Sequence, residues 1–411
     1  MSDSVRYEAF LAVERIEGGA YSNLVFTSSR LTGKDLAFAE RIALGTTERS
    51  ITLGHIIDIY VQKKCDKRIE ALLKTGIYQI LYMTKVPDSA ACDETTEIAK
   101  KLFGKQKAGF VNAILRNVVR NKDRILADIA KSVGRIKYSV GDGIYNLIKN
   151  DYPDEYDSIF EAFLENKRCF LRVNTVTTDA KSLAAEVGGN ALSDKTVECS
   201  SARDALAAVK EGKCIIQGLG SQKAVELLDA KSGMTVVDVC ACPGGKSLGA
   251  AMDMNNSGKI YSFDIHQNKL SLITKSAETL GISIISAEIN DGRRPKSELF
   301  GKADRVICDV PCSGTGEMGS KPEIKYKDPA MFGRLYDTQR EILKNSAKYL
   351  RAGGIMVYST CSINKTENEK AVEHFLHSED GKDYRLESQC TYLPTGFAAE
   401  GFYTARIIRE K

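Results

Sequence analysis

The sequence lacks several features that would place it in a class of protein at once. Its 411 residues contain no tryptophan, which by itself decides nothing, and no apolar run long enough to cross a bilayer. The first residues, Met1-Ser-Asp-Ser-Val-Arg6, lack the apolar stretch of a secretory signal peptide. We therefore expect a protein that is neither inserted in a membrane nor exported, and that works in the cytoplasm.

Metal-binding and disulfide patterns are also missing. The four histidines are not suitably spaced, and the eleven cysteines include no Cys-x-x-Cys pair of the kind that holds structural zinc. Eleven is an odd number, and the cysteines show no regular spacing, so we expect reduced thiols and no bound metal.

Charge is small overall but uneven along the chain. The formal net charge is +4, while residues 1–135 hold 22 lysines and arginines against 16 aspartates and glutamates. A modest basic excess suits a polyanionic partner, although solubility alone explains it equally well. Charge by itself therefore does not establish binding to nucleic acid.

The amino-terminal third has the apolar periodicity of helices, and a domain of 1–135 built only from helices is expected. The predicted helices are Leu36–Glu48, Leu53–Gln62, Arg68–Met83, Ser89–Leu102 and Ala108–Val119. Residues 131–170 continue helically with a break at Asp151-Tyr-Pro153. A small α+β linker domain of 136–220 is expected next, with strands at Phe170–Asn174, Thr196–Cys199 and Lys213–Ile216 and helices at Asp179–Glu186 and Ala202–Val209.

Residues 221–411 alternate apolar strands with amphipathic helices, which is typical of a mostly parallel α/β sheet. After a helix at Ser221–Leu228, the predicted strands are Met234–Val239, Lys259–Asp264, Ile282–Ser286, Arg305–Asp309 and Gly354–Tyr358. Such a sheet binds its ligand outside the carboxyl ends of its strands. The segments that follow these strands are therefore expected to face one crevice.

A glycine-rich turn and an acidic strand end indicate a nucleotide-like cofactor. Gly244 and Gly245 follow the first strand and let the backbone approach a ligand, while Asp264 ends the second strand and can accept hydrogen bonds from ribose hydroxyls. A generic tight turn with a helix-capping aspartate explains the same residues. The turn is not Gly-x-Gly-x-x-Gly, so a nicotinamide cofactor is disfavoured, and Cys240 stands where a phosphate-binding loop needs glycine.

Two cysteines differ from the other nine because each follows a strand and sits among small polar residues. They are Cys312, in Asp309-Val-Pro-Cys-Ser-Gly-Thr-Gly316, and Cys361, in Ser359-Thr-Cys-Ser362. A thiolate suits reversible addition to an electron-poor carbon such as carbon 6 of a pyrimidine. A free thiol has a pKa of about 8.5, so neighbours must favour the anion, and Lys246 is the candidate neighbour. Cysteines interpreted simply as small buried apolar residues are Cys65, Cys92, Cys169, Cys199, Cys214, Cys308 and Cys390.

These motifs resemble a known family, the RNA cytosine-5 methyltransferases of the RsmB/Nop2/Sun group. The matching segments are Asp238-Val-Cys-Ala-Cys-Pro-Gly-Gly-Lys246, the Pro-Cys segment around Cys312, Leu350-Arg-Ala-Gly-Gly354 and the Thr-Cys segment around Cys361 with Glu367-Asn-Glu369. Phe110-Val-Asn-Ala-Ile-Leu-Arg-Asn117 also resembles a NusB-like RNA-binding domain. The resemblance implies a Rossmann-like class I methyltransferase domain, an all-α NusB-like amino-terminal domain and a linker domain of RNA-recognition type.

The resemblance also implies a substrate, a cofactor and roles for particular residues. The implied substrate is 16S ribosomal RNA, methylated from S-adenosylmethionine by a monomer. Cys361 is the implied nucleophile toward carbon 6 of cytosine, Cys312 helps release the product, and Asp309 contacts the base while Lys246 belongs to the catalytic set. The implied cofactor site consists of Cys240, Ala241, Cys242, Pro243, Gly244, Gly245, Lys246, Asp264, Asp291 and Asp309.

Departures from the family pattern bear on the substrate more than on the reaction. After Gly316 the family commonly has two arginines, whereas this chain has Met318-Gly-Ser-Lys321, which would weaken phosphate contact there. Other open interpretations are action on transfer RNA or another RNA, a non-catalytic RNA-binding or antitermination factor, and a DNA cytosine methyltransferase. The last places its nucleophile in the Pro-Cys motif and has no need of Thr-Cys.

Three arginines recur every four residues, at Arg116, Arg120 and Arg124. If the helix that begins near Ala108 continues past Val119, they form one basic stripe, with Val111, Ile114, Leu115 and Val118 mainly on another face. The hypothesis is contact with RNA phosphates. A solvated helix face is an equally good interpretation of the pattern alone.

Overall fold

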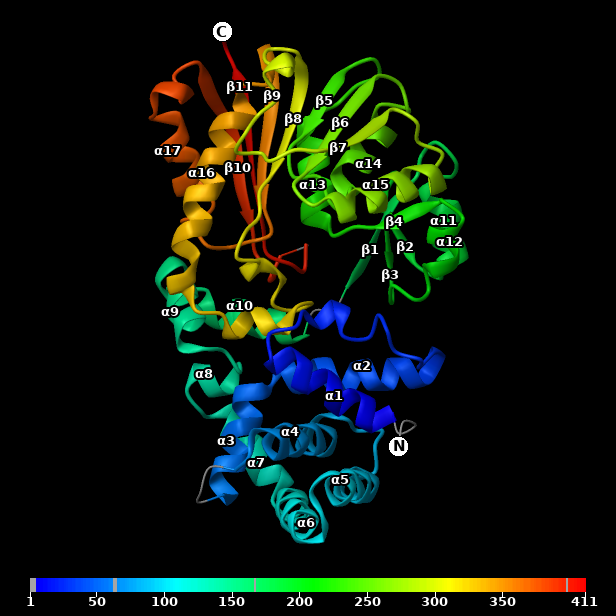
Figure 1. Ribbon diagram of the computed structural model, residues 1–411, viewed down its shortest axis with the longest axis vertical. Helices are drawn as coiled ribbons and strands as arrows, with labels where there is room; N and C mark the ends of the chain where they lie inside the picture. The colour runs from blue at the N-terminus through cyan, green and yellow to red at the C-terminus, as the bar shows by residue number, and fades with distance from the viewer. Residues whose placement is uncertain (1–4, 62–64, 166–167, 397) are drawn as a thin grey trace. The chain divides into compact units, whose positions relative to one another are not determined.

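A computed structural model describes residues 5–61, 65–165, 168–396 and 398–411. The described residues form two compact units (Figure 1). One contains residues up to 164 together with 318–329, and the other contains 165–317 and 330–411. This partition does not test the expected boundaries at residues 135 and 220, which stay predictions.

The first unit is helical, and its core is built around one buried helix, α4. The helices are α1 (Val5–Glu17), α2 (Gly33–Glu48), α3 (Ser50–Tyr60), α4 (Lys67–Tyr82), α5 (Asp88–Phe103), α6 (Lys105–Arg120), α7 (Lys122–Ala130), α8 (Gly134–Lys137), α9 (Asp142–Asp151) and α10 (Tyr156–Glu165), with a short 3-10 turn at Ser22–Leu24. Asp66 caps α4 by accepting a hydrogen bond from the Arg68 backbone N–H at 2.9 Å. Gly45 of α2 lies against Tyr78 of α4 so closely that a Cβ there would fall 2.0 Å from the ring.

The five predicted helices are present, with one boundary that matters for function. Of the predicted ends, Gln62 lies outside the described residues. The helix predicted from Ala108 runs only to Arg120, where Asn121 closes it through a backbone N–H to the Asn117 carbonyl, and α7 begins at Lys122. The condition for one continuous basic stripe is therefore not met, because Arg124 lies on a second helix.

A segment far along the chain completes the helical unit. Residues 318–329, with the 3-10 turn Pro322–Tyr326, belong to this unit although they follow the Pro-Cys motif. Lys325 is fully buried, and its Nζ donates to the carbonyls of Glu48 at 3.3 Å and Tyr138 at 3.0 Å. The Tyr326 hydroxyl donates to the Thr47 carbonyl at 2.6 Å. The segment thus binds the carboxyl end of α2, whose last carbonyls have no partner within the helix.

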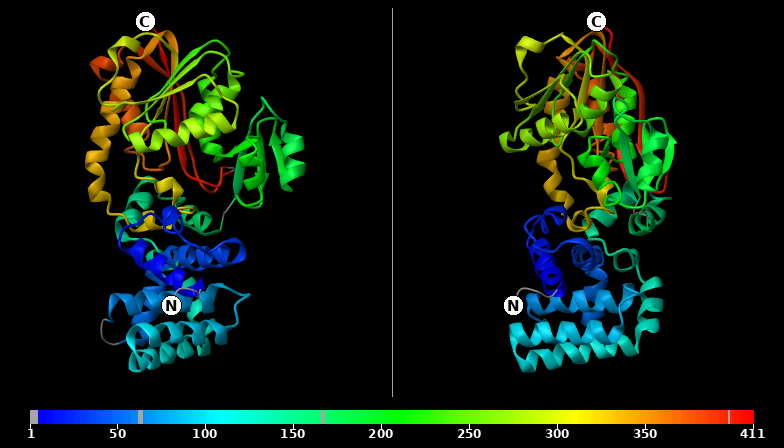
Figure 2. Two further views of the ribbon diagram at one scale, coloured as in Figure 1. Left: turned by 45° about the vertical axis from the view of Figure 1, so that its right-hand side comes forward. Right: turned by 90° about the vertical axis from the view of Figure 1, so that its right-hand side faces the viewer.

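The second unit begins with a small four-stranded antiparallel sheet in the order β2-β3-β1-β4. Its strands are β1 (Cys169–Val173), β2 (Asn190–Ser193), β3 (Thr196–Cys199) and β4 (Cys214–Ile216). Helices α11 (Ala180–Val187) and α12 (Leu206–Lys210) cover one face of it (Figure 2) and bury Leu183 and Ala208 against Leu171 and Val197. Strand β2 was not predicted, because all four of its residues are exposed and carry no apolar alternation.

The larger sheet has seven strands in the order β10-β11-β9-β8-β5-β6-β7, with β5 to β9 parallel and β11 antiparallel to both of its neighbours. The strands are β5 (Thr235–Asp238), β6 (Lys259–Asp264), β7 (Ile285–Ile289), β8 (Ala303–Asp309), β9 (Leu350–Thr360), β10 (Tyr384–Tyr392) and β11 (Phe402–Arg409).

Helices cover both faces of this sheet (Figure 1). Helices α13 (Leu219–Leu228), α14 (Gly245–Asp253) and α15 (Gln267–Thr279) pack on one face with Val236, whereas α16 (Gly333–Ala347) and α17 (Glu369–Leu376) pack on the other with Val237. Short 3-10 turns lie at Ser297–Leu299, Thr315–Glu317, Pro329–Phe332 and Glu379–Gly381. Neighbouring residues of one strand thus point to opposite faces, which explains why the strands read as continuous apolar runs.

One predicted strand is displaced, and two were not predicted. The strand expected at Ile282–Ser286 is β7, three residues later, because Ile282 instead closes the end of α15 through its N–H to the Ala277 carbonyl at 2.8 Å. The carboxyl-terminal strands β10 and β11 had no counterpart in the prediction. Strand β10 forms the edge of the sheet and is largely exposed, so its sequence lacks a buried strand's apolar pattern.

Candidate active site

Most of the predicted site residues lie at the carboxyl ends of four neighbouring strands, β9, β8, β5 and β6. Since β8 lies between β5 and β9, the segments after these three strands are neighbours, and β6 adds Asp264 on the other side of β5. The turn after β5 holds Cys240 to Gly245, β8 ends at Asp309, and Cys361 directly follows β9. The shared sheet edge therefore explains why motifs more than a hundred residues apart form one site.

The glycine-rich turn is fixed against the end of β6. The Ala241 N–H donates to the Phe263 carbonyl at 2.7 Å, and the Cys242 N–H donates to Asp264 Oδ2 at 3.2 Å. Gly244 has a φ of +109°, which favours glycine, and Gly245 begins α14. The turn therefore presents the amino end of α14, whose first N–H groups lack partners within the helix, beside the carboxylate of Asp264.

A buried amide beside this turn was not predicted from the sequence. Gln217 follows β4 and is only 6% exposed, and among the described residues neither polar atom of its side chain has a hydrogen-bond partner. Its Nε2 lies 3.3 Å from the position that a Cβ on Gly245 would occupy. A buried amide normally has partners, so this one fits a polar ligand seated over the turn. Its only sequence signal is an isolated polar residue after a short strand.

Asp291 lies beyond the end of β7 and forms an ion pair with Arg293. Asn290, which precedes it, donates its N–H to the Asp264 carbonyl at 3.0 Å, so the two strand ends are adjacent. The Arg293 guanidinium binds Asp291 through Nη2 to Oδ2 at 2.8 Å and through Nε to Oδ1 at 3.0 Å. These hydrogen bonds from Arg293 hold the pKa of Asp291 below its ordinary value. Asp291 is thus a carboxylate held at the margin of the turn.

Lys246, Asp309 and Ser359 form a chain that joins the turn to the two thiol segments. Lys246 Nζ donates to Asp309 Oδ2 at 2.7 Å, and the Ser359 hydroxyl donates to Asp309 Oδ1 at 2.6 Å. Burial alone would lower the pKa of Lys246, but the Asp309 carboxylate outweighs it and the pKa is raised. The ammonium also lies 5.3 Å from the centroid of the Phe402 ring. Lys246 is therefore charged and fixed in place.

The two candidate thiols meet directly. Cys312 Sγ and Cys361 Sγ are 2.8 Å apart. The contact with Cys312, and next burial, raise the pKa of the Cys361 thiol well above its ordinary value. Lys246 is a neighbour of Cys361, since a Cys361 thiolate is one of the groups that raise the pKa of Lys246, but the contact with Cys312 and burial have the larger effect on the thiol. Cys361 is a protonated thiol here and must lose its proton before it can attack.

Two glycines let the segments around the thiols approach each other. The Gly316 N–H donates to the Cys361 carbonyl at 3.0 Å, and the Gly401 N–H donates to the Gly316 carbonyl at 2.8 Å. A Cβ on Gly316 would fall 1.9 Å from the Gly401 carbonyl oxygen. The Pro-Cys segment, the Thr-Cys segment and the loop before β11 are therefore packed backbone to backbone at this point.

The other cysteines are mostly structural, with one correction. Burial raises the pKa of Cys242 to about 12 and that of Cys240 well above its ordinary value, so neither is a ready nucleophile. Cys92, Cys199, Cys214 and Cys308 are buried as expected, and Cys65 and Cys169 are partly buried. Cys390 is exposed, so its interpretation as a buried residue is wrong, because β10 is an edge strand.

The predicted RNA-binding arginines are exposed on the helical unit, but two of them have acidic partners. Arg116 binds Asp93 of α5 at 2.8 Å, and Arg124 binds Asp128 within α7 at 3.7 Å. Arg120 ends α6 and is exposed. Exposed ion pairs of this kind are weak, so a phosphate can replace the carboxylate at little cost.

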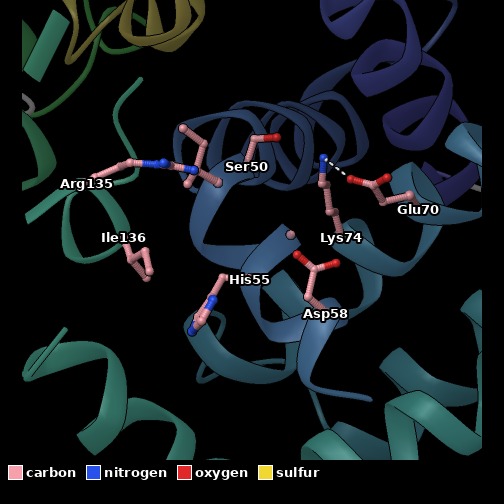
Figure 3. A pocket seen from close by; sticks show the side chains of 9 residues that line it. Ser50, His55, Asp58, Glu70, Lys74, Arg135 and Ile136 are labelled. Atoms are coloured by element: carbon pink, nitrogen blue, oxygen red, sulfur yellow. Dashed lines mark ion pairs between the residues drawn. The ribbon is translucent and has the colours of Figure 1, made fainter. Parts of the chain in front are cut away.

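The helical unit also has an open pocket of about 280 Å³ between α3, α4 and α8 (Figure 3). Ser50, His55, Asp58, Glu70, Lys74, Arg135 and Ile136 are among its lining residues. Lys74 is held by Glu17 and Glu70, both at 2.9 Å, and Arg135 is held by Asp142 at 3.1 Å. Lys74 is nearly buried and bound by two carboxylates, so it is less available to a polyanion than the exposed arginines, whereas the exposed Arg135–Asp142 pair resembles the Arg116–Asp93 pair.

In residues 5–61, 65–165, 168–396 and 398–411, no three histidine, cysteine, aspartate or glutamate side chains come together in a way that could hold a metal ion. Within the same ranges, none of the helices combines the length and the apolar character needed to cross a membrane.

Sequence comparisons match both parts of the chain to known proteins. The family described as 16S rRNA methyltransferase RsmB/F matches residues 225–408, and the NusB family matches residues 3–120. A probable ribosomal RNA small subunit methyltransferase B from Bacillus subtilis (strain 168) is 32% identical over 427 residues, which cover 97% of this chain and 94% of that protein.

Solved structures share the fold. The crystal structure of PH0851 matches with a TM-score of 0.79 at 22% identity and covers 100% of both chains. The crystal structure of NSun6 from Pyrococcus horikoshii with SFG has a TM-score of 0.59 at 18% identity and covers 66% of this chain and 98% of that one. The expected fold class, with a NusB-like helical part and a Rossmann-like methyltransferase sheet, is confirmed.

Proposed function

Because this chain belongs to the RsmB/F family of ribosomal RNA methyltransferases, we propose that it methylates carbon 5 of a cytosine in 16S ribosomal RNA through a covalent bond to Cys361. The observation that carries the proposal is the pair of thiols, 2.8 Å apart, beside the Lys246–Asp309 ion pair. A single nucleophile does not require a second thiol. A reaction that forms and later breaks a carbon–sulfur bond has a use for both.

The turn after β5 would hold S-adenosylmethionine, and the residues present fit it. Gly245 begins α14, so the first N–H groups of that helix lie at the turn, Asp264 offers a carboxylate to ribose hydroxyls, and the Gln217 amide has no hydrogen-bond partner among the described residues. Asp291 and the segment Cys240–Pro243 complete the proposed wall. When bound there, S-adenosylmethionine supplies an electrophilic methyl group.

The steps assigned to the protein begin with Cys361. Its Sγ loses a proton and bonds to carbon 6 of the cytosine, and the displaced electron pair makes carbon 5 nucleophilic toward the methyl group. Asp309, held by Lys246 and Ser359, contacts the polar edge of the base near N3 and N4 and favours the adduct. A base then removes the carbon-5 proton, the carbon–sulfur bond breaks, and Cys312 assists this release.

The proposed substrate is small-subunit ribosomal RNA, bound by a monomer in the cytoplasm. The name of the Bacillus relative supports the choice of small-subunit RNA, and the NusB match supports a helical domain that binds RNA. Radiolabel transfer from S-adenosylmethionine to 16S RNA, to transfer RNA and to DNA tests the choice. Equal transfer to transfer RNA would contradict the ribosomal assignment, and no transfer to any of them would leave a non-catalytic RNA-binding factor.

Substitution of each thiol tests the chemistry. Cys361→Ala is expected to abolish methyl transfer and any protein–RNA adduct, because no other group then activates carbon 5. Cys312→Ala is expected to attack and methylate but to stall at elimination, so that an adduct accumulates. Denaturing gel electrophoresis would show it as a slowly migrating band that contains protein and RNA.

The exposed Cys390 provides the matched control, since Cys390→Ala removes a thiol on β10 that is separate from the pair. It should retain wild-type transfer and show no stalled adduct. An adduct trapped by Cys361→Ala and lost in Cys312→Ala would reverse the two roles. The absence of an adduct in every variant would leave the two-thiol mechanism without support.

A further inference from the structure

We infer that Glu367 is a positioning residue that holds the Cys312 and Cys361 segments in register. The inference rests on the proposed function for its catalytic consequence, but its geometry is independent of the substrate. Glu367 lies between β9 and α17, and its exposure is 0%. It belongs to the Glu-Asn-Glu segment, to which the proposed mechanism assigns no role.

One carboxylate binds both thiol segments. Glu367 Oε1 accepts a hydrogen bond from the Ser313 N–H at 2.7 Å, and Oε2 accepts from the hydroxyls of Ser313 and Ser362, both at 2.5 Å. Ser313 directly follows Cys312, and Ser362 directly follows Cys361. The carboxylate is thus one residue removed from each thiol and touches neither.

Helix α16 extends this contact to the other side of Cys312. Gln339 Nε2 donates to Glu367 Oε1 at 2.9 Å and to the Pro311 carbonyl at 2.9 Å. Pro311 and Ser313 flank Cys312, so the backbone on both sides of that thiol is fixed through one carboxylate and one amide. The position of Cys312 Sγ relative to Cys361 Sγ therefore depends on Glu367.

Glu367 is itself anchored. Its carbonyl accepts from the buried Tyr358 hydroxyl at 2.7 Å, and its N–H donates to the Asn364 carbonyl at 3.0 Å. The four hydrogen bonds to its carboxylate oxygens come from neutral donors, which together satisfy a buried carboxylate. A carboxylate has enough lone pairs for all four, whereas a carboxamide has one acceptor oxygen.

The inference predicts a specific kinetic defect. Glu367→Gln keeps the size of the side chain but loses acceptors for the two serine hydroxyls, so the thiol spacing should loosen while the substrate sites stay intact. We expect kcat to fall 10- to 100-fold, with KM for 16S RNA and for S-adenosylmethionine within twofold of wild type. Glu367→Ala should lose more activity than Glu367→Gln.

Glu369→Gln is the matched control. It makes the same chemical change two residues away, but Glu369 Oε1 accepts from the Thr391 hydroxyl of β10 at 2.6 Å and does not join the thiol segments through that bond. Wild-type kcat in Glu367→Gln, or an equal loss in Glu369→Gln, would overturn the inference. A rise in KM with unchanged kcat would overturn it as well, since that result assigns Glu367 to binding.

A second measurement needs neither RNA nor activity. Phenylarsine oxide binds two adjacent thiols: two arsenic–sulfur bonds form, the thiol protons join the oxide oxygen, and one water leaves. Phenylarsine oxide binding that is present in wild type but absent from Cys312→Ala is binding to the Cys312–Cys361 pair. We expect the affinity of this pair for phenylarsine oxide to be at least tenfold weaker in Glu367→Gln than in wild type. In Glu369→Gln the affinity should be unchanged.

The two measurements separate the positioning role from the proposed function. Weakened arsenical binding in a protein that methylates no RNA would uphold the positioning role and contradict the function. Unchanged arsenical affinity in Glu367→Gln would overturn the positioning role whatever the activity. Circular dichroism of each variant establishes that it is folded, and Glu367→Gln serves where Glu367→Ala does not fold.

Discussion

At the scale of single residues, Asp238 has an environment that the sequence did not reveal. It ends β5 at the start of the glycine-rich turn and is 1% exposed. Its Oδ2 accepts from the Ser247 hydroxyl at 2.6 Å, while its Oδ1 has no partner among the described residues. Burial raises its pKa from 3.8 to about 7. The folded protein therefore favours the neutral carboxyl form of Asp238.

The raised pKa predicts a pH-dependent stability. The folded protein holds the Asp238 proton more tightly than the unfolded chain, so the stabilising contribution is fully present below pH 3.8 and is lost as the pH rises through about 7. We expect Asp238→Asn to remove this loss, so that the variant gains stability relative to wild type between pH 5 and 8. Urea unfolding of both proteins at pH 5 and pH 8 measures their free energies of unfolding. A difference between variant and wild type that is the same at both pH values would contradict the prediction.

Asp264 and Asp291 lead to a prediction about binding. Asp264→Ala removes the proposed ribose contact and also the acceptor for the Cys242 N–H, and Asp291→Ala removes the partner of Arg293. Each should weaken the binding of S-adenosylmethionine about 10- to 150-fold, since one lost charged hydrogen bond is worth about 1.5–3 kcal/mol. Calorimetric titration measures this, with Asp194→Ala in the exposed turn after β2 as the control. Unchanged affinity in both variants would remove these residues from the site.

The site could be located from the sequence, but its internal contacts could not. Strand ends and glycines indicated one crevice, and the family resemblance indicated which thiol to propose as the nucleophile. The pairing of Lys246 with Asp309, the Gln217 amide and the carboxylate of Glu367 depend on side chains from distant segments. Hydrogen bonds across separations such as the 54 residues between Ser313 and Glu367 leave no local pattern.

At the scale of elements, prediction succeeded for the buried parallel strands, although β11 was missed despite its mainly buried residues. Strand β6 was predicted with its observed bounds, Lys259–Asp264, because it is apolar and ends in a carboxylate. Strands β2 and β10 were missed because their residues are mainly exposed. The break between α6 and α7 falls at Asn121, and no glycine or proline marks it.

The two helices α6 and α7 carry a prediction about RNA. Replacement of Arg116, Arg120 and Arg124 by alanine should weaken 16S RNA binding. The slope of the logarithm of the binding constant against the logarithm of the salt concentration should become shallower by about 0.7–0.9 for each lost phosphate contact. Arg385→Ala on β10, where Arg385 pairs with Glu410, is the control. An unchanged salt slope in the triple variant would show that these arginines are only a solvated face.

At the scale of the whole molecule, the helical unit depends on residues 318–329. Lys325→Met removes the donor to the Glu48 and Tyr138 carbonyls, and the loss of such buried hydrogen bonds costs about 1–3 kcal/mol each. We expect faster amide hydrogen exchange in α2 and α3 with little change in β5 and β6. Lys131→Met, at an exposed position after α7, is the control. Equal exchange in wild type and Lys325→Met would contradict the dependence.

The same segment constrains the order in which the protein is made. Lys325 follows its acceptor Tyr138 by 187 residues, so the ribosome must synthesise the chain through β8 and the Cys312 segment before this donor exists. The helices emerge first, yet their unit is completed only when residues 318–329 leave the exit tunnel. A nascent chain that stops before residue 318 therefore lacks part of its first unit and cannot complete it.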